Sequence, residues 1–232
     1  MSDNSSATDR AEILLGRAGI ERLRGLRVIL FGVGGVGSWC AEALIRSGVG
    51  SLTMVDPDVV VASNINRQLP ATTLTLGEPK VEVMRRRLLE INPEADIRAL
   101  QTRYSADNAD DFDFADYDYV VDAIDSLADK ALLILRATAC KTTTLVSSMG
   151  AARKLDPLRV RVEEFWKVKG CPLAAALRSR FRRSGQFPAR KFKVVFSDEV
   201  QPNSDKGSLV QITAVWGMNL AALIVTPPKG AR

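Results

Sequence analysis

The feature that most constrains this chain is a glycine-rich segment that lies between two apolar runs near the N-terminus. The first run, residues 28–31, has the length and the β-branched content of a buried parallel strand. A helical pattern follows the glycines, and a second apolar run, residues 52–55, ends at Asp56. This order predicts a strand–turn–helix–strand unit that holds a nucleotide. The glycines of the segment are Gly32, Gly34, Gly35 and Gly37.

Each part of this unit has an expected physical role. Gly32 makes the tight turn, Gly34 lets the backbone approach a phosphate, and Gly37 lets the helix pack closely on the strand. The helix N-terminus offers free N–H groups and a positive dipole end. Asp56 can accept hydrogen bonds from ribose hydroxyls. The alternative is a packing turn in an α/β domain that binds nothing.

Apolar runs and helical stripes alternate through the rest of the chain. This alternation predicts an α/β fold with a doubly wound, mostly parallel, Rossmann-like sheet. The expected helices cover residues 10–26, 80–92, 107–112 and 127–141, and the expected strands cover residues 97–100, 117–124 and 144–149.

The last third of the chain changes character and predicts antiparallel strands and a basic helical insert. We expect strands at 160–165 and 192–196, a basic helix at 172–183 and an apolar helix at 209–225. Gln211 and Asn219 interrupt the apolar helix, which favours a core helix and no membrane insertion. We therefore expect one domain over 10–226, with a nucleotide-binding core at 25–150 and a substrate-facing part at 151–226. Residues 1–9 are an expected disordered tail, and residues 227–232 an expected frayed tail.

Composition excludes several kinds of chemistry. The chain of 232 residues contains no histidine, which rules out a histidine base, a histidine triad and histidine-ligated metals. Its three cysteines form no C-x-x-C pair, so no structural zinc is expected. No signal peptide is visible, and a cytoplasmic location is the expectation. The net charge of +5 permits a polyanionic partner without requiring one.

Polar groups gather where the predicted strands end, which is where ligands bind in such sheets. Arg67 and Lys80 are two cations that can meet a triphosphate, and Asp125 can hold Mg²⁺ through oxygen. Lys80 could instead be a surface residue, and Asp125 could instead cap the helix that follows it. The other polar candidates at these strand ends are Asp56, Asp58, Asn64, Gln68 and Asp122.

Two enzyme classes can use this glycine turn. A dehydrogenase would bind NAD there, but it needs a proton relay and has no need for a second cluster of cations and acids around the phosphates. The cluster fits ATP and Mg²⁺ better.

Basic residues concentrate in the last third of the chain and predict a surface for a polyanion, although they could also form a solvated basic face. Phe181, Phe187 and Phe192 lie among them and could stack on bases or pack in the core. The basic residues are Arg178, Arg180, Arg182, Arg183, Arg190, Lys191 and Lys193.

Four motifs in sequence order carry a specific resemblance. GVGGVGSW, VDPDVVVASNINRQ, GEPKVEV and VVDAIDS resemble the superfamily that adenylates carboxylates, which includes the ubiquitin-activating enzymes and the thiamine- and molybdopterin-pathway adenylyltransferases. RAEILLG, SNINRQLPA, SSMGAARKLDP, CPLA and VVFSDE further resemble its tRNA threonylcarbamoyladenosine dehydratase family. The resemblance covers residues 10–199. It implies ATP-dependent ring closure of N6-threonylcarbamoyladenosine beside the tRNA anticodon, by a homodimer.

The resemblance also implies roles for individual residues. The four glycines would bind ATP, Asp56 its ribose, and Asp125 the Mg²⁺ ion. Arg10 would reach ATP from the partner subunit, although Arg17 and Arg22 are alternatives because Ala11 replaces the usual aromatic residue. Asn64, Arg67, Gln68 and Lys80 would hold phosphates.

Three questions stay open at this point. The proton lost on ring closure needs a base, for which Asp58 and Asp122, both counted with the ATP site, are candidates. Cys171 could act as a nucleophile, although Pro172 at a helix start explains the local sequence. The protein could also adenylate the C-terminal glycine of a ubiquitin-like sulfur carrier, with a sulfur-carrier or sulfur-transfer protein as partner, or it could sense a nucleotide without turnover.

Overall fold

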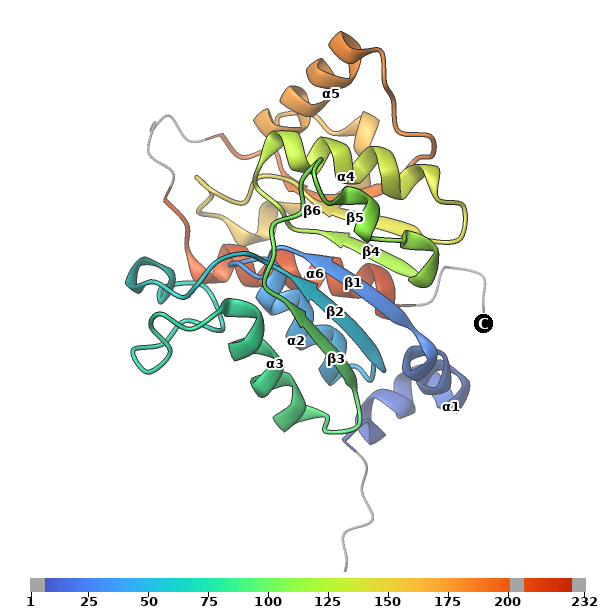
Figure 1. The fold of residues 1–232 in the computed structure, drawn as a ribbon, viewed down its shortest axis with the longest axis vertical. Coiled ribbons are helices and arrows are strands. Elements are labelled where there is room, and N and C mark those ends of the chain that lie inside the picture. Colours follow the sequence, from blue (N-terminus) through green and yellow to red (C-terminus); the bar gives the residue numbers. More distant parts are fainter. Residues whose placement is uncertain (1–6, 201–206, 227–232) are drawn as a thin grey trace, which may run out of the picture.

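The computed structural model describes residues 7–200 and 207–226. Its centre is a seven-stranded sheet in the order β3-β2-β1-β4-β5-β7-β6 (Figure 1). Only β6 runs antiparallel to its neighbour β7 within this sheet. The predicted doubly wound, mostly parallel sheet is therefore confirmed. The strands are β1 Arg27–Phe31, β2 Ser51–Val55, β3 Asp96–Leu100, β4 Tyr119–Asp122, β5 Thr144–Ser148, β6 Val160–Glu164 and β7 Lys193–Ser197.

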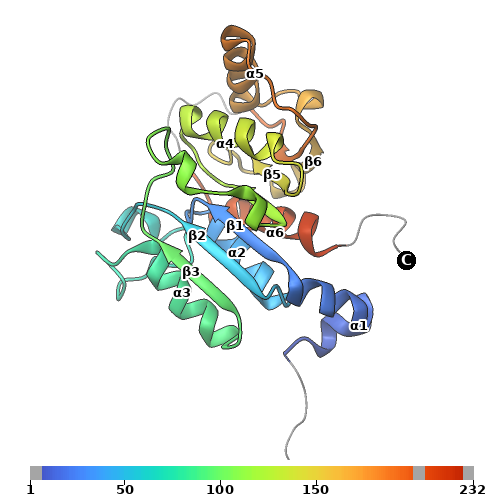
Figure 2. The ribbon, with the colours of Figure 1, turned by 45° about the vertical axis from the view of Figure 1, so that its right-hand side comes forward.

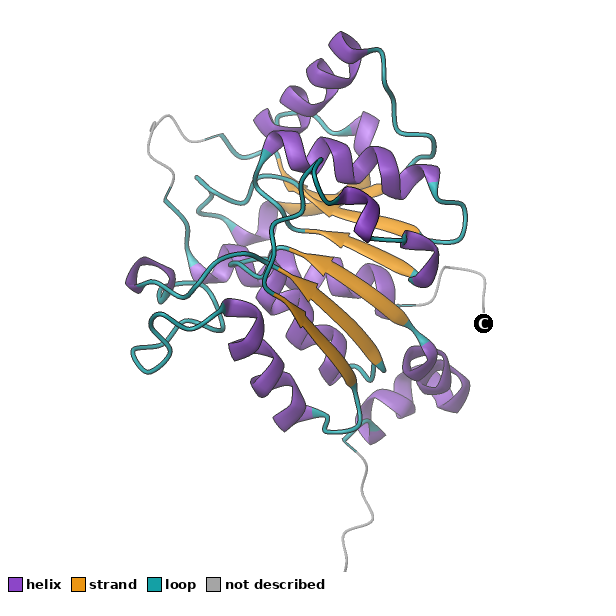
Figure 3. Ribbon diagram, viewed as in Figure 1, coloured by secondary structure: helices purple, strands orange, loops and turns teal. Residues whose placement is uncertain are grey.

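Helices cover both faces of the sheet (Figure 3). Side chains of α2, α3 and α6 join one buried cluster, and side chains of α4 and α5 join the other. The basic helix of the last third is α5. The helices are α1 Asp9–Gly25, α2 Gly37–Arg46, α3 Lys80–Ile91, α4 Leu127–Ala139, α5 Pro172–Ser184 and α6 Val210–Val225.

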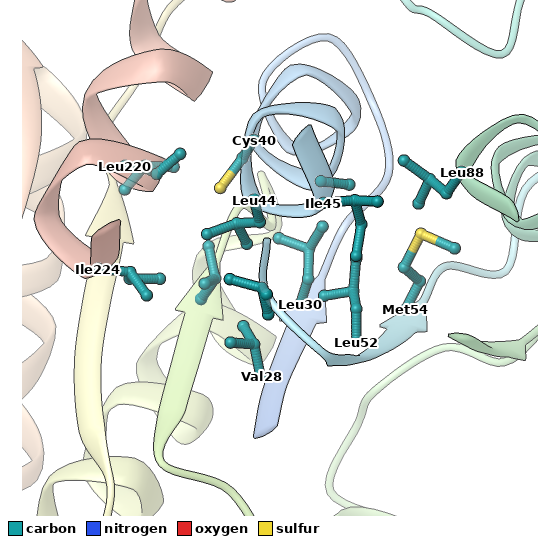
Figure 4. Packing of buried hydrophobic residues seen from close by; sticks show 14 of the residues in the cluster. Val28, Leu30, Cys40, Leu44, Ile45, Leu52, Met54, Leu88, Leu220 and Ile224 are labelled. Carbon is teal, nitrogen blue, oxygen red and sulfur yellow. The ribbon is translucent and has the colours of Figure 1, made fainter. Parts of the chain in front are cut away.

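The first strand shows why its sequence is apolar without interruption. Val28 and Leu30 belong to the cluster under α2 and α6, whereas Ile29 and Phe31 belong to the cluster under α4. Successive side chains of a strand point to opposite faces, so a strand with helices on both faces is apolar at every position. Figure 4 shows the first cluster, in which Cys40, Leu44, Leu220 and Ile224 lie around these strand residues.

The short helix predicted over 107–112 is present only as a single 3₁₀ turn. The connection between β3 and β4 contains only two single-turn 3₁₀ helices, Ala109–Asp111 and Phe114–Asp116. Phe112 and Phe114 are buried, with ring centroids 5.4 and 6.0 Å from that of Phe31. Asparagine and aspartate compete with a helix for backbone hydrogen bonds, and packing both rings on Phe31 keeps the connection irregular.

The helix predicted before β1 is present but broken. Gly16 has φ 70° and ψ 165°, a conformation outside the helical region, so α1 consists of two helical segments. Its start at Asp9 lies inside the tail that the sequence predicts to be disordered, while residues 1–6 and 227–232 lie outside the described residues.

The apolar C-terminal run forms the core helix α6, as predicted. Trp216 is buried there, and its indole Nε1 donates to the carbonyl of Val195 at 3.1 Å. Among residues 7–200 and 207–226, no helix has the length and hydropathy needed to cross a membrane.

Candidate functional site

A cavity of about 790 Å³ opens at the carboxyl ends of β1, β2, β4 and β5. The strand order reverses between β1 and β4, which is the point at which open α/β sheets bind ligands. The segments around the cavity come from the glycine turn, the loop after β2, the loop after β3, the loops after β4 and β5, and the start of α5. Helix α1 lies beyond the other end of β1 (Figure 2).

The glycine turn divides its tasks as the sequence predicts. Gly32 has φ 91°, and a Cβ there would lie 2.6 Å from the carbonyl of Ala123. A Cβ on Gly37 would lie 1.8 Å from the carbonyl of Gly32, so only glycine permits this approach of helix to strand. Gly34 and Gly35 line the cavity, whereas Gly37 does not. Gly37 therefore belongs to the packing of the turn and is not a contact residue of the cavity.

Asp56 is fixed at the cavity wall by the backbone. Its Oδ2 accepts from the amide of Val33 at 2.6 Å, and its Oδ1 accepts from the amide of Asp58 at 2.9 Å. Burial raises the pKa of Asp56, and the two amides only partly offset this effect. Each carboxylate oxygen keeps a second lone pair, so the group can still accept a hydrogen bond from a ligand.

Lys80 is a buried lysine and not a surface residue. It is the first residue of α3 and only 4% exposed, and its Nζ lies 2.7 Å from Oδ2 of the exposed Asp58. Both residues line the cavity. An ammonium group carries three N–H bonds, so two remain for a ligand.

Arg67 reaches the cavity from the loop after β2. Its Nη1 donates to the carbonyl of Ser63 and to Oδ1 of Asn66, both at 2.8 Å. The indole of Trp39 donates to the backbone carbonyl of Arg67 at 3.1 Å and fixes the loop. No carboxylate forms a salt bridge with this guanidinium in the described parts of the chain, so its charge is available to an anion.

Gln68 and Asn64 complete this loop. Gln68 is 8% exposed and lines the cavity, and its Oε1 has no hydrogen-bond partner among the described residues. A buried amide oxygen without a partner is costly, so this oxygen can accept a hydrogen bond from a ligand or from water. Asn64 is also buried in the cavity wall, where its Oδ1 accepts from the amide of Val61 at 3.3 Å.

Asp122 and Asp125 separate into two roles. Asp122 is fully buried, where it accepts from Nζ of Lys130 at 2.8 Å and from Oγ of Ser147 at 2.6 Å. The prediction that Asp122 contacts ATP is corrected, because it lies beneath the cavity and not in its wall. Asp125 is exposed in the cavity wall. The N-cap of α4 is Ser126, so Asp125 is not the cap residue.

The carboxylates do not form a ready metal cage. No group of three or more cysteine, aspartate or glutamate side chains in the described residues is arranged to hold a metal ion. Asp125 and Asp58 are exposed carboxylates in the cavity wall, and Asp58 is already paired with Lys80. The Asp125 carboxylate suits Mg²⁺, which keeps most of its waters and is usually held through one or two carboxylates and substrate phosphates.

The loop after β3 contributes residues that the sequence interpretation missed. Arg103 lies in the cavity wall, and its Nη2 forms a salt bridge of 2.7 Å with Oδ2 of Asp129. Tyr104 is 3% exposed, and its hydroxyl has no partner among the described residues. The rule that ligand groups follow parallel strands could have identified this loop, which comes directly after the predicted strand 97–100.

A second set of missed residues comes from the last third of the chain. Lys154 and Glu199 line the cavity although both are only 5% exposed. Cys171, which the sequence already identifies as a possible nucleophile, lines the cavity beside them, is 3% exposed, and precedes Pro172 at the start of α5. The cavity therefore joins the glycine turn to the segments after β5 and β7.

Arg10 does not reach this cavity. It is exposed in the first segment of α1. Two residues earlier, Thr8 lies 3.2 Å from where a Cβ of Gly48 would be, in the turn before β2. That turn is at the amino end of the sheet, opposite the cavity.

The basic cluster divides into free and engaged residues. The Arg190 guanidinium donates to backbone carbonyls at the end of α4 and in the turn after it, including Thr138 at 3.0 Å and Thr143 at 2.8 Å, so these hydrogen bonds hold it against the fold. Arg178 is half-buried over the ring of Phe165 at 5.8 Å. The other exposed members are Arg180, Arg182, Arg183, Lys191 and Lys193.

The aromatic residues of this region mostly pack in the core. Phe181 and Phe192 are buried in the cluster under α4 and α5, so of the two alternatives left open by the sequence they take core packing. Phe187 is 54% exposed.

Comparison with known proteins places this site in a family. Residues 8–182 match the ThiF family. The tRNA threonylcarbamoyladenosine dehydratase of Bacillus subtilis is 40% identical over 190 residues, which cover 82% of this chain and 74% of that protein. The Escherichia coli enzyme TcdA in complex with ATP has a TM-score of 0.88 at 32% identity, covering 94% of this chain and 92% of that one. The sulfur carrier protein ThiS adenylyltransferase of E. coli is 33% identical over 130 residues, 56% of this chain and 51% of that protein. The chain therefore belongs to the ThiF family and, within it, to the tRNA threonylcarbamoyladenosine dehydratases.

Proposed function

We propose that this protein uses ATP to cyclise N6-threonylcarbamoyladenosine in tRNA, through adenylation of the threonyl carboxylate. The observation that carries the proposal is one cavity in which the glycine turn, Arg67 and Lys80 meet, in a chain of this family. The E. coli relative of the same fold holds ATP. Arg67 and Lys80 supply positive charge to the cavity beside the glycine turn, and the start of α2 supplies free N–H groups, which supports phosphate binding there.

The first step activates the carboxylate. A carboxylate oxygen of the threonyl group forms a bond to the α-phosphorus of ATP, and the bond from that phosphorus to the bridging oxygen breaks. Pyrophosphate leaves with the electron pair. Arg67 and Lys80 neutralise charge on the phosphate oxygens, which is the main contribution a protein can make to such a transfer.

The second step closes the ring. The ureido nitrogen attacks the acyl carbon, the bond from that carbon to the phosphate oxygen breaks, and AMP leaves. The nitrogen loses its proton, for which Asp58 is the remaining candidate base because Asp122 is sealed in the core. Both reacting groups belong to one nucleoside, so a favourable orientation lowers the barrier.

Mg²⁺ fits this site through Asp125 and the phosphates. The ion would neutralise charge on the triphosphate. Asp125 is the accessible carboxylate on the loop after β4, and Lys130 holds that loop by donating to the carbonyl of Ile124 at 2.9 Å.

A homodimer would explain the position of Arg10. In one chain Arg10 lies at the amino end of the sheet, away from the cavity, so it can contribute only to the site of a second copy. Ile13 and Leu14 are 74% and 83% exposed in the same helical segment, an apolar surface that a partner subunit would cover.

The exposed basic residues of α5 and the following loop are the proposed tRNA surface. Replacing Arg180, Arg182 and Arg183 together with glutamine would lower tRNA affinity, and the slope of log affinity against log salt would fall by about 0.9 for each phosphate that the variant no longer neutralises. A filter-binding titration at several salt concentrations measures this slope. The matched control replaces three exposed arginines of α3 and β3, Arg85, Arg86 and Arg98, and leaves the slope unchanged. An unaltered slope in the α5 variant would show that tRNA binds another face of the protein.

The direct test of function is the mass of the modified nucleoside. Purified protein incubated with ATP, Mg²⁺ and tRNA that carries N6-threonylcarbamoyladenosine should convert it to a product lighter by one water, with one AMP and one pyrophosphate released. If pyrophosphate exchange responds to a small sulfur-carrier protein and not to tRNA, the alternative adenylyltransferase activity is correct. The similarity to the ThiS adenylyltransferase covers less of the chain, which disfavours that alternative.

A further inference from the structure

The cavity contains a buried lysine that the chemistry above does not use. Lys154 follows β5, lines the cavity and is 5% exposed. Its Nζ donates to the backbone carbonyl of Glu199. The Glu199 carboxylate accepts from the amides of Leu155 and Asp156 at 3.1 Å. A contact between segments 45 residues apart in sequence thus fixes the lysine at the cavity wall.

The charge of Lys154 has no counter-charge at salt-bridge distance among the described residues. Lys80 and Lys130, the other buried lysines, each pair with an aspartate at 2.7 and 2.8 Å. Burial lowers the pKa of Lys154, and the Cys171 thiol and Glu199 offset this only in part. A buried cation is costly unless an anion accompanies it, and two of its three N–H bonds are not used by the protein.

A second feature of the cavity near Lys154, the N-terminus of α5, also favours an anion. Helix α5 has 13 residues and begins at Pro172, which lines the same cavity. Its N-cap, Cys171, forms no side-chain cap hydrogen bond. The free N–H groups and the positive dipole end of a helix N-terminus stabilise negative charge nearby.

We infer that Lys154 and the amino end of α5 form the subsite for the carboxylate of the substrate. This inference rests on the proposed function and identifies the place from which the acyl oxygen approaches the nucleotide. Lys154 pairs with the carboxylate before the first step, and the pairing ends when the oxygen is bonded to phosphorus and its charge is lost. The residue therefore contributes to substrate binding.

The test compares two ligands on matched variants. The ligands are the free nucleoside N6-threonylcarbamoyladenosine and its analogue with a neutral carboxamide in place of the carboxylate. Calorimetry measures the affinity of the protein for each ligand in the presence of an ATP analogue in which a methylene group replaces the α–β bridging oxygen. The wild-type protein should bind the acid at least about ten-fold more tightly than the amide, as expected for a hydrogen-bonded charge pair. Lys154→Gln should bind both equally, and Lys154→Arg should keep part of the preference because it keeps the cation.

Controls separate this inference from loss of folding. Lys141→Gln removes an exposed lysine just before β5, at the opposite end of the sheet, and should behave as wild type. Each variant is checked for affinity toward the ATP analogue and for melting temperature. If Lys154→Gln does not fold, the Lys154→Arg variant tests the role of Lys154. A folded arginine variant that no longer prefers the acid over the amide overturns the assignment.

The possible failures are distinguishable. A Lys154→Gln protein that discriminates acid from amide as well as the wild type overturns the role of Lys154 and leaves the proposed function standing. A wild-type protein that binds the ATP analogue and neither nucleoside, and that also leaves N6-threonylcarbamoyladenosine in tRNA unchanged in the mass assay, overturns the proposed substrate, and the subsite with it.

Discussion

Two lysine–aspartate pairs near the carboxyl ends of β2 and β4, the strands on either side of β1, look alike and have different environments. Lys80–Asp58 lies at the cavity and Lys130–Asp122 lies beneath it, with nitrogen–oxygen distances of 2.7 and 2.8 Å. In the first pair the aspartate side chain is 62% exposed, whereas both side chains of the second pair are fully buried. Distance therefore does not distinguish a binding group from a structural one, and exposure does.

The physical reason is solvation. The Lys130–Asp122 pair is cut off from water, so its charges interact strongly and neither can be removed without leaving the other uncompensated. Asp58 stays hydrated, so Lys80 can exchange part of its interaction for a ligand phosphate at low cost. The buried pair holds the fold together, and the pair at the cavity is available for chemistry.

The largest expected effect is the loss of stability when the buried Lys130–Asp122 pair is broken. Lys130→Met leaves the Asp122 carboxylate buried without its cation and should lower the free energy of unfolding by about 3–5 kcal/mol. Urea denaturation followed by circular dichroism measures it. The double variant Lys130→Met/Asp122→Leu should recover more than half of the loss, because no buried charge remains. A loss of less than about 1 kcal/mol in the single variant would contradict the comparison.

The next effect is on catalysis and not on stability. Lys80→Met should slow AMP formation by about 10²–10³-fold, the range for removing one group that stabilises transition-state charge. The free energy of unfolding should change by no more than about 1 kcal/mol, because Asp58 remains solvated. Single-turnover assays at saturating ATP give the rate. If Lys80→Met lowers the free energy of unfolding as much as Lys130→Met does, the two pairs make equivalent contributions to stability and the comparison is wrong.

A mixing experiment sharpens the comparison by testing whether the cavity is completed by a second chain. Arg10→Ala and Arg67→Ala should each be nearly inactive alone. If Arg10 acts across a two-fold dimer, randomly mixed subunits regain about one quarter of wild-type activity, because half of the dimers contain one intact site of two. Refolding an equimolar mixture and measuring AMP release checks this. No recovery would place Arg10 outside the site.

The smallest effect concerns Tyr104, which lies between the two regions. Its ring packs on Phe31 at 4.9 Å, and its buried hydroxyl has no partner among the described residues, although the residue lines the cavity. Tyr104→Phe should therefore change the free energy of unfolding at neutral pH by less than about 1 kcal/mol. Burial raises the pKa of Tyr104 from 10.0 to about 12.

The pH dependence of the same variant provides a second readout. The folded protein resists ionisation of Tyr104 more than the unfolded chain does, so wild-type stability should fall relative to Tyr104→Phe as pH rises from 10 toward 12. Parallel denaturation series of the two proteins measure the difference. Superimposable curves would show that the hydroxyl gains a partner, such as water, in solution.

Much of the fold follows from local sequence. The apolar run 28–31, the glycines and the helical stripe of α2 predict the unit that surrounds the cavity, and Gly32 and Gly37 have the geometry that their residue type requires. Most predicted strands and helices are confirmed within one or two residues at their ends. The short helix predicted over 107–112 is reduced to one 3₁₀ turn, because the tertiary packing of Phe112 and Phe114 on Phe31 replaces local preference.

The sequence alone determined the class of fold, the place of the cavity and the residue types that gather there, because strand ends, glycine turns and helix starts are local properties. Only the tertiary structure decided that Asp122 is sealed beneath the cavity, that Arg190 is occupied by α4, and that Lys154 is held by Glu199 in the cavity wall. Burial and charge pairing join segments that are distant in the chain, and the environment of an ionisable group is set by those distant neighbours.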